Sequence, residues 1–75
     1  MGRLNGFSGR DVRRVAEAIG WQYQRMHGDH MVFWRSKSPL NLSIPDHREV
    51  REGTLRRLIR IMGLTVDEFL EFARK

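Results

Sequence analysis

The sequence predicts one α+β domain in which helices gather on one face of a three-stranded antiparallel sheet, in the order α-β-β-β-α-α. Apolar residues recur with helical spacing over residues 8–20 and again over residues 54–74. Between them, residues 21–45 are rich in β-forming residues and are interrupted by turn residues. The chain has 75 residues, which is enough for one domain with a thin core.

The first helix is expected to begin after Ser8, a capping residue, with Asp11 placing negative charge near the helix start. Residues 1–7 are expected to form a flexible lead-in, and residues 8–75 to form the domain. Gly20 is expected to end the helix in a left-handed conformation. The buried stripe follows the i, i+3, i+4, i+7 rule and comprises Val12, Val15, Ala16 and Ile19.

A β-hairpin is expected next, with Gly28-Asp29 as its two-residue turn. His27 and His30 flank this turn, so we expect them to lie directly opposite each other and to point to the same face. Strict alternation assigns to that face Trp21, Tyr23, Arg25, Val32 and Trp34. It assigns to the other face Gln22, Gln24, Met26, Met31, Phe33 and Arg35. Neither set is clearly the apolar one, so the pattern leaves open which face meets the helices.

A third strand is expected after a turn over residues 36–39. Leu40, Leu42 and Ile44 alternate there with polar residues, as in a half-buried strand. Pro45 is expected to end this strand, because proline cannot donate a backbone hydrogen bond to a neighbouring strand.

Two helices are expected to follow a polar loop over residues 46–52. Thr54 is expected to cap the first of them, and Gly63 to end it. Thr65 and Glu68 match a capping box, which predicts the start of the second. The buried stripes of the two helices are expected to comprise Leu55, Leu58, Ile59 and Met62, then Val66, Phe69, Leu70 and Ala73.

The charge of the chain indicates an anionic partner. There are 14 Lys and Arg residues against 9 Asp and Glu, a net charge of +5, and all of the basic residues except Lys37 and Lys75 are arginines. A basic small domain is typical of nucleic-acid binders, and arginine bonds phosphate in a bidentate manner. Charge that serves only solubility is the alternative. The candidate RNA-binding residues are Arg10, Arg13, Arg14, Arg25, Arg56, Arg57 and Arg60.

Three histidines lie at or near predicted turns, and histidine is the side chain that exchanges a proton near neutral pH. His30 is the candidate general acid or base, and His27 and Asp29 are candidate accessory residues beside it. His47 follows a strand-ending proline, where it would position RNA or serve the entry to the next helix. A metal site made of these residues lacks the usual ligand spacings, so no metal and no other cofactor is expected.

Other features narrow the class of protein. No cysteine is present, which excludes disulfides and thiolate zinc sites. No apolar run approaches the roughly 20 residues of a membrane span, and nothing suggests export, so a cytoplasmic protein without a membrane partner is expected. The three predicted aromatic β-formers Trp21, Tyr23 and Trp34 would stack on unpaired bases or, more commonly in so small a chain, belong to the core.

The order and spacing of five motifs resemble the HicA (YcfA-like) mRNA interferases, which are toxins of HicAB type II toxin–antitoxin systems. The resemblance runs from about Ser8 to Phe72. The motifs are Ser8-Gly9-Arg10-Asp11-Val12, Gly28-Asp29-His30, Ser43-Ile44-Pro45-Asp46-His47, Gly53-Thr54-Leu55-Arg56 and Ile61-Met62-Gly63-Leu64-Thr65. The resemblance implies a double-stranded-RNA-binding-like fold, metal-independent cleavage of mRNA, and inhibition by a HicB-like antitoxin that covers the active site.

The resemblance also implies a role for particular residues. The family's catalytic histidine follows a Gly-Ser pair, and His30 takes that position, with Asp29 in place of the serine. The family's Pro-x-His matches Pro45-Asp46-His47. A carboxylate beside an imidazole favours the charged form, which would make His30 a better acid and a poorer base. Asp29 would either weaken the chemistry by repelling phosphate or orient the imidazole, and the sequence leaves both open.

Two other functions compete with a ribonuclease toxin. The first is a non-catalytic RNA-binding module on the same fold, in which Asp29 has weakened the chemistry. The second is a DNA-binding protein whose arginine-rich helix enters a major groove. The sheet-centred layout counts against the DNA-binding alternative.

Overall fold

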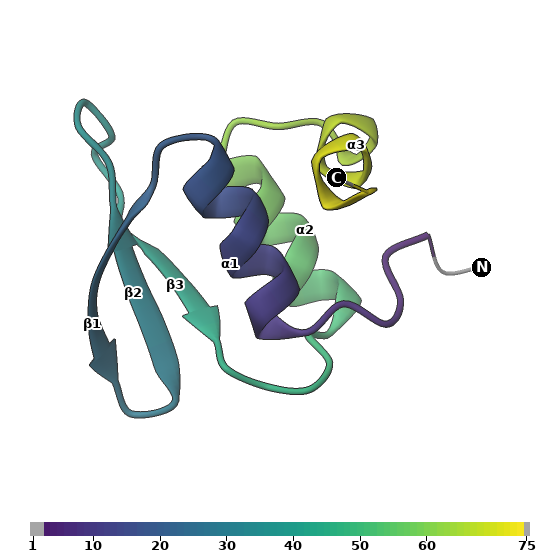
Figure 1. The fold of residues 1–75 in the computed structure, drawn as a ribbon, viewed down its shortest axis with the longest axis horizontal. Helices are drawn as coiled ribbons and strands as arrows, with labels where there is room; N and C mark the ends of the chain where they lie inside the picture. The colour runs from purple at the N-terminus through teal and green to yellow at the C-terminus, as the bar shows by residue number, and fades with distance from the viewer. Residues whose placement is uncertain (1–2, 75) are drawn as a thin grey trace.

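The predicted order of elements is confirmed in the computed structural model, which describes residues 3–74. The three strands form one antiparallel sheet in the order β1-β2-β3. Helices α1 and α2 cover one face of this sheet, and α3 lies beyond them, away from the strands (Figure 1). This is an α+β, double-stranded-RNA-binding-like arrangement. The elements are α1 (Gly9–Ala18), β1 (Gln22–His27), β2 (His30–Trp34), β3 (Leu42–Pro45), α2 (Glu52–Ile61) and α3 (Val66–Arg74).

Helix α1 begins and ends as predicted. The Asp11 backbone N–H donates to the Ser8 hydroxyl, and the Ser8 backbone N–H donates to the Asp11 carboxylate, which completes a capping box. Gly20 follows the helix with a φ of +102°, the left-handed region that glycine adopts without steric cost. Val12, Val15 and Ala16 are buried, while Ile19 is half-buried.

The hairpin has the predicted pairing at its turn, where His27 lies opposite His30. The register shifts between Tyr23 and Arg25, so Gln24 is an extra residue in β1. Because of this bulge, Tyr23 pairs with Phe33 and shares its face, with the two rings packed edge to face. The prediction that Tyr23 shares a face with the histidines was therefore wrong. It assumed strict alternation of side chains between the two faces, which an inserted residue interrupts.

The sheet face that meets the helices is the one that carries Met31 and Phe33. These residues pair with Ile44 and Leu42 of β3, and all four side chains are buried in the core. His30, Val32 and Trp34 alternate with them along β2 and therefore belong to the outer face. The burial pattern thus settles which face is apolar, a point that the sequence left open.

The third strand begins later than predicted. Leu40 is 56% exposed and precedes β3. The Ser38 hydroxyl donates to the Leu40 carbonyl oxygen, and its oxygen also accepts from the Leu40 N–H. Lys37, with a φ of +72°, turns the chain just before this point. These local hydrogen bonds compete with the strand ladder, so Leu40 stays in the turn.

The start of α2 also differs from the prediction. The helix begins at Glu52 after Arg51, and no side chain caps it, so Thr54 lies inside the first turn instead of capping it. The preceding loop is fixed by tertiary contacts, because Val50 is buried and its N–H donates to the Phe7 carbonyl oxygen at 2.7 Å. The buried stripe is confirmed and comprises Leu55, Leu58, Ile59 and Met62.

Helix α3 is capped by the predicted box, in which the Glu68 N–H donates to the Thr65 hydroxyl and the Thr65 N–H donates to the Glu68 carboxylate. Its Phe69 is buried and packs edge to face against Phe7. Leu4, in the segment expected to be a lead-in, is buried in the same core.

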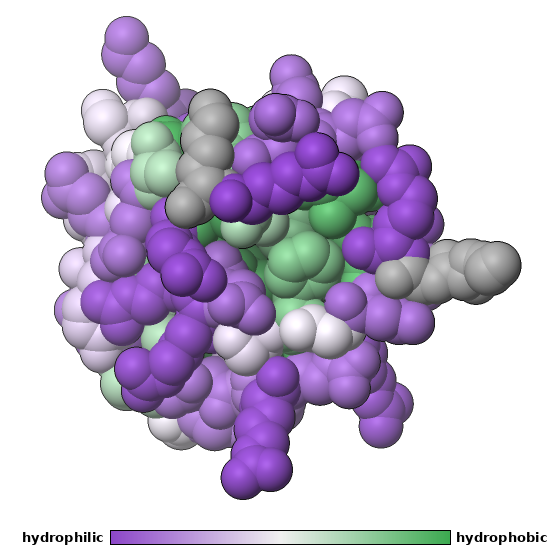
Figure 2. Space-filling model, turned by 45° about the vertical axis from the view of Figure 1, so that its right-hand side comes forward, coloured by the Kyte–Doolittle hydropathy of each residue, from purple (hydrophilic) through white to green (hydrophobic). Residues whose placement is uncertain are grey.

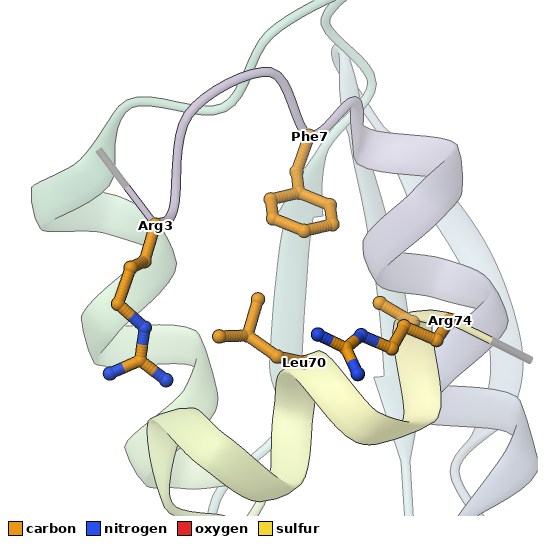
Figure 3. A pocket seen from close by; sticks show the side chains of 5 residues that line it. Arg3, Phe7, Leu70 and Arg74 are labelled. Carbon is orange, nitrogen blue, oxygen red and sulfur yellow. The ribbon is translucent and has the colours of Figure 1, made fainter. Parts of the chain in front are cut away.

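A shallow hollow of about 420 Å³ lies between the segment that precedes α1 and helix α3. Its apolar floor is visible in Figure 2, and Figure 3 shows Arg3 and Arg74 on either side of Phe7 and Leu70. Arg3 also forms an ion pair with Asp67. Within residues 3–74, no helix has the length and apolar character needed to cross a bilayer.

The capping difference between the two helices can be measured. Ser8→Ala is expected to lower the free energy of unfolding by about 1 kcal/mol, because it leaves an N–H at the start of α1 without its acceptor. The matched variant Thr54→Ala removes no cap and is expected to change the free energy of unfolding by less than about 0.5 kcal/mol. Urea unfolding followed by circular dichroism checks both. An equal loss in the two variants would contradict the assignment of the caps.

Candidate active site

The candidate active site is centred on Asp29, which links two of the three histidines. His47 Nε2 lies 2.8 Å from Asp29 Oδ2, and His30 Nδ1 lies 3.1 Å from Asp29 Oδ1. The centres of the two imidazole rings are 6.4 Å apart. All three side chains are 44–64% exposed, so a ligand reaches them directly from solvent. The structure thus brings together His30, Asp29 and His47 from the hairpin turn and the loop after β3.

Backbone hydrogen bonds hold these segments together. The Asp46 N–H donates to the Asp29 carbonyl oxygen at 2.8 Å, and the Gly9 N–H donates to the His47 carbonyl oxygen at 2.9 Å. The hairpin turn, the loop after β3 and the first turn of α1 consequently meet at one end of the molecule, the lower end in Figure 1. These backbone hydrogen bonds help to position the segments that carry His30 and His47.

Gly9 is required where α1 meets the end of β3. A Cβ atom at this position would overlap the Pro45 carbonyl oxygen and would approach Asp46 Cα to 3.1 Å. Glycine alone lets the helix start come this close to the backbone of the loop. The approach also brings Arg10 Nε to 3.6 Å from the Asp46 carboxylate, which places a cation beside the histidines.

The charge state of Asp29 follows from its contacts. The hydrogen bond from His47 is the main cause that lowers the pKa of Asp29 below its ordinary value of 3.8, and the nearby charges of His30 and His47 act in the same direction. At neutral pH Asp29 is therefore ionised and can only accept hydrogen bonds. His47 Nε2 must accordingly carry the proton that it donates to Asp29.

The same carboxylate lies within ion-pair distance of His30. Its Nδ1 faces Asp29, while its Nε2 has no partner among residues 3–74. An imidazole held at one nitrogen by a carboxylate presents the other nitrogen for proton transfer. Both effects of Asp29 that the sequence left open, orientation of the ring and repulsion of a phosphate, are compatible with this distance.

His27 is placed differently from the other two histidines. It lies opposite His30 in the hairpin, as predicted, but within residues 3–74 its imidazole forms no hydrogen bond or ion pair. Among those residues, no group of three or more potential ligands has an arrangement that would hold a metal ion.

The seven arginines expected to bind RNA differ in their contacts. Arg13 packs over the rings of Tyr23 and Phe33 and donates to Glu17, which gives it a structural role. In the remaining pairs with carboxylates the arginine side chains are exposed, and such surface pairs are worth little in water. They join Arg10 to Asp46, Arg14 to Asp11 and Arg56 to Glu52. Arg25, Arg57 and Arg60 form no ion pair with any of residues 3–74.

Two arginines that follow His47 in the chain were not singled out from the sequence. Arg48 and Arg51 lie in the exposed loop that follows His47, and neither pairs with a carboxylate among the described residues. Their proximity in sequence to His47, between Pro45 and the next helix, is the signal that identifies them. They add positive charge to the loop that carries His47.

Comparison with known families connects this site to one of them. The family model described as the HicA toxin of bacterial toxin–antitoxin systems matches residues 9–64. The match begins at Gly9, includes Asp29, His30 and His47, and ends before α3. No curated protein matches the chain.

The link between Asp29 and His47 predicts a pH dependence. Because folding lowers the Asp29 pKa, the ionised carboxylate favours the folded state above pH 3.8, and this contribution is lost as the pH falls through the lower folded value. In His47→Ala the Asp29 pKa is expected to rise towards 3.8, as measured by carbon NMR of the carboxyl group. His27→Ala is the control that leaves it unchanged. An unaltered Asp29 pKa in His47→Ala would exclude this hydrogen bond as the cause.

The close approach at Gly9 predicts a loss of stability. Gly9→Ala is expected to lower the free energy of unfolding by about 1–3 kcal/mol, because the added methyl group forces α1 and the Pro45 backbone apart. Gly53→Ala is the matched control, since Gly53 is also in the first turn of a helix but has no atom within 4 Å of its added Cβ. Urea titration measures both. A Gly9→Ala protein as stable as the control would contradict the contact.

Proposed function

The chain belongs to the HicA toxin family of bacterial toxin–antitoxin systems, and from this premise we propose that it is an endoribonuclease that cleaves mRNA without a metal ion. Membership of the family implies an antitoxin partner. The observation that carries the proposal is the placement of His30, whose Nδ1 lies 3.1 Å from the ionised Asp29 and whose side chain is 44% exposed.

RNA supplies its own nucleophile, so the protein needs only to move protons and to stabilise charge. The 2′-hydroxyl oxygen attacks the adjacent phosphorus, the bond from phosphorus to the 5′ oxygen breaks, and a cyclic phosphate remains. His30 Nε2 is the group that takes the proton from the 2′-hydroxyl or gives one to the leaving 5′ oxygen. A positioned histidine accelerates such a step by about 10²–10⁴-fold.

Positive charge near the histidines would stabilise the transition state, in which the phosphate gains negative charge. Arg10 lies at the start of α1 beside Asp46, and Arg48 and Arg51 lie in the loop that carries His47. Their exposure leaves them free to reach phosphate oxygens in a bidentate manner. The role of His47 is to hold Asp29 in its ionised form, and thereby to position His30 indirectly.

The partner is expected to be a HicB-like antitoxin that inhibits the enzyme by covering His30. The exposed position of the site suits this mode of inhibition, because Asp29, His30 and His47 are all at least 44% exposed. A surface placed over these three side chains would exclude the RNA from the proton carrier.

A non-catalytic RNA-binding module is the second candidate, and one observation favours it. The carboxylate of Asp29 occupies the position of the family's serine, 3.1 Å from His30 Nδ1. A fixed negative charge at this distance opposes the approach of a phosphate. The two functions predict different behaviour of the protein towards a long RNA.

The test is cleavage of a long mRNA in EDTA by purified protein freed of any bound partner. His30→Ala is expected to reduce the cleavage rate by about 10²–10⁴-fold while leaving RNA binding intact. His27→Ala is the matched control, because this histidine shares the hairpin turn but makes no contact with Asp29. If neither the wild type nor His30→Ala cuts while both bind RNA, the chain is a binding module and the catalytic assignment is wrong.

A further inference from the structure

The outer face of the sheet is a surface that the proposed chemistry does not yet use. Helices α1 and α2 cover only the opposite face (Figure 1). His30, Val32 and Trp34 alternate along β2 on the outer face, and cross-strand pairing adds His27 opposite His30 and Arg25 opposite Val32. The candidate catalytic histidine therefore lies at one end of a row of side chains that ends at Trp34.

The structure distinguishes the three aromatic residues that the sequence offered as candidates for base stacking. Trp21 is buried, with only 2% of its surface exposed, and Arg35 covers its ring. Tyr23 packs against Phe33 and beneath Arg13. Trp34 is 42% exposed, and its ring contacts no other ring or cation among residues 3–74. Trp34 is the member of this set that presents a free aromatic face.

The charge of this face suits a polyanion. The three strands contain no Asp or Glu, and Arg25, on the same face, forms no ion pair with any described residue. The surface therefore combines one exposed aromatic ring with an unpaired cation and the imidazole of His30. Single-stranded nucleic acid is bound by this combination, in which bases stack on aromatic rings and cations follow the backbone.

We propose that Trp34 is a base-stacking site for single-stranded RNA, and that the strand runs along the outer face of the sheet from Trp34 to His30. Four residues of β-strand separate the two side chains by about 13 Å. This distance corresponds to about four nucleotides of a stacked strand, or fewer of an extended one. The proposal rests on the proposed function, because it takes His30 as the site of cleavage. It assigns the substrate to unpaired RNA, since a base within a duplex has no free face for the indole.

The experiment measures binding separately from cleavage. A short single-stranded RNA with 2′-O-methyl riboses cannot be cut, because the nucleophile is blocked. Its binding to the wild type is expected to quench the fluorescence of Trp34, while buried Trp21 is unaffected. Trp34→Ala is expected to weaken binding by about 5- to 150-fold. Trp34→Phe retains an aromatic face and is expected to restore most of the affinity.

The controls distinguish a loss of RNA binding from a loss of folding. Leu40→Ala removes another exposed apolar side chain, one that precedes β3, and is expected to leave affinity unchanged. Circular dichroism confirms that each variant is folded. If Trp34→Ala binds the single strand as tightly as the wild type, or if the wild type prefers a duplex of the same sequence, the stacking site is wrong. If Trp34 controls binding but no RNA is cut in EDTA, the stacking site stands and the ribonuclease proposal fails.

Discussion

The close approach of Gly9 to the carbonyl group of Pro45 holds the candidate site together. It lets the first turn of α1 approach the end of β3 so closely that the Gly9 N–H reaches the His47 carbonyl oxygen. The loop held in this way is joined to the hairpin turn by the hydrogen bond from Asp46 to Asp29. One glycine thus allows three segments that are distant in sequence to meet at the candidate site. A larger residue would separate the helix from the loop and so disrupt the candidate site.

Within this frame, Asp29 has two separate consequences. It places an ionised carboxylate beside His30, where the proposed function would bring a phosphate. It also accepts a hydrogen bond from His47, and it lies within ion-pair distance of His30 Nδ1. The lowered pKa keeps the carboxylate ionised, so the contact persists at neutral pH.

The arginines of the chain have different structural roles. Arg13 contributes to packing, and Arg35 covers the ring of Trp21, so neither is simply part of a solvated cationic surface. Other arginines pair with exposed carboxylates on their own helices. Arg25 lies on the outer face of the sheet and Arg48 follows His47, and neither forms an ion pair with a described residue. Net charge alone indicates an anionic partner, and these unpaired arginines are candidates for contact with it.

Features that depend on near neighbours could be predicted from the amino-acid sequence. They are the helical stripes, the capping boxes at Ser8 and Thr65, and the pairing of His27 with His30, because each involves residues within a few positions of one another. Three features became known from the folded chain: the bulge at Gln24, the start of α2 ahead of Thr54, and the hydrogen bond between Asp29 and His47, which are 18 positions apart. These depend on which segments lie against each other. The physical reason is that local hydrogen bonds and periodicity act along the chain, whereas close approach at Gly9 and burial of Val50 act between segments, and no spacing in the sequence encodes them.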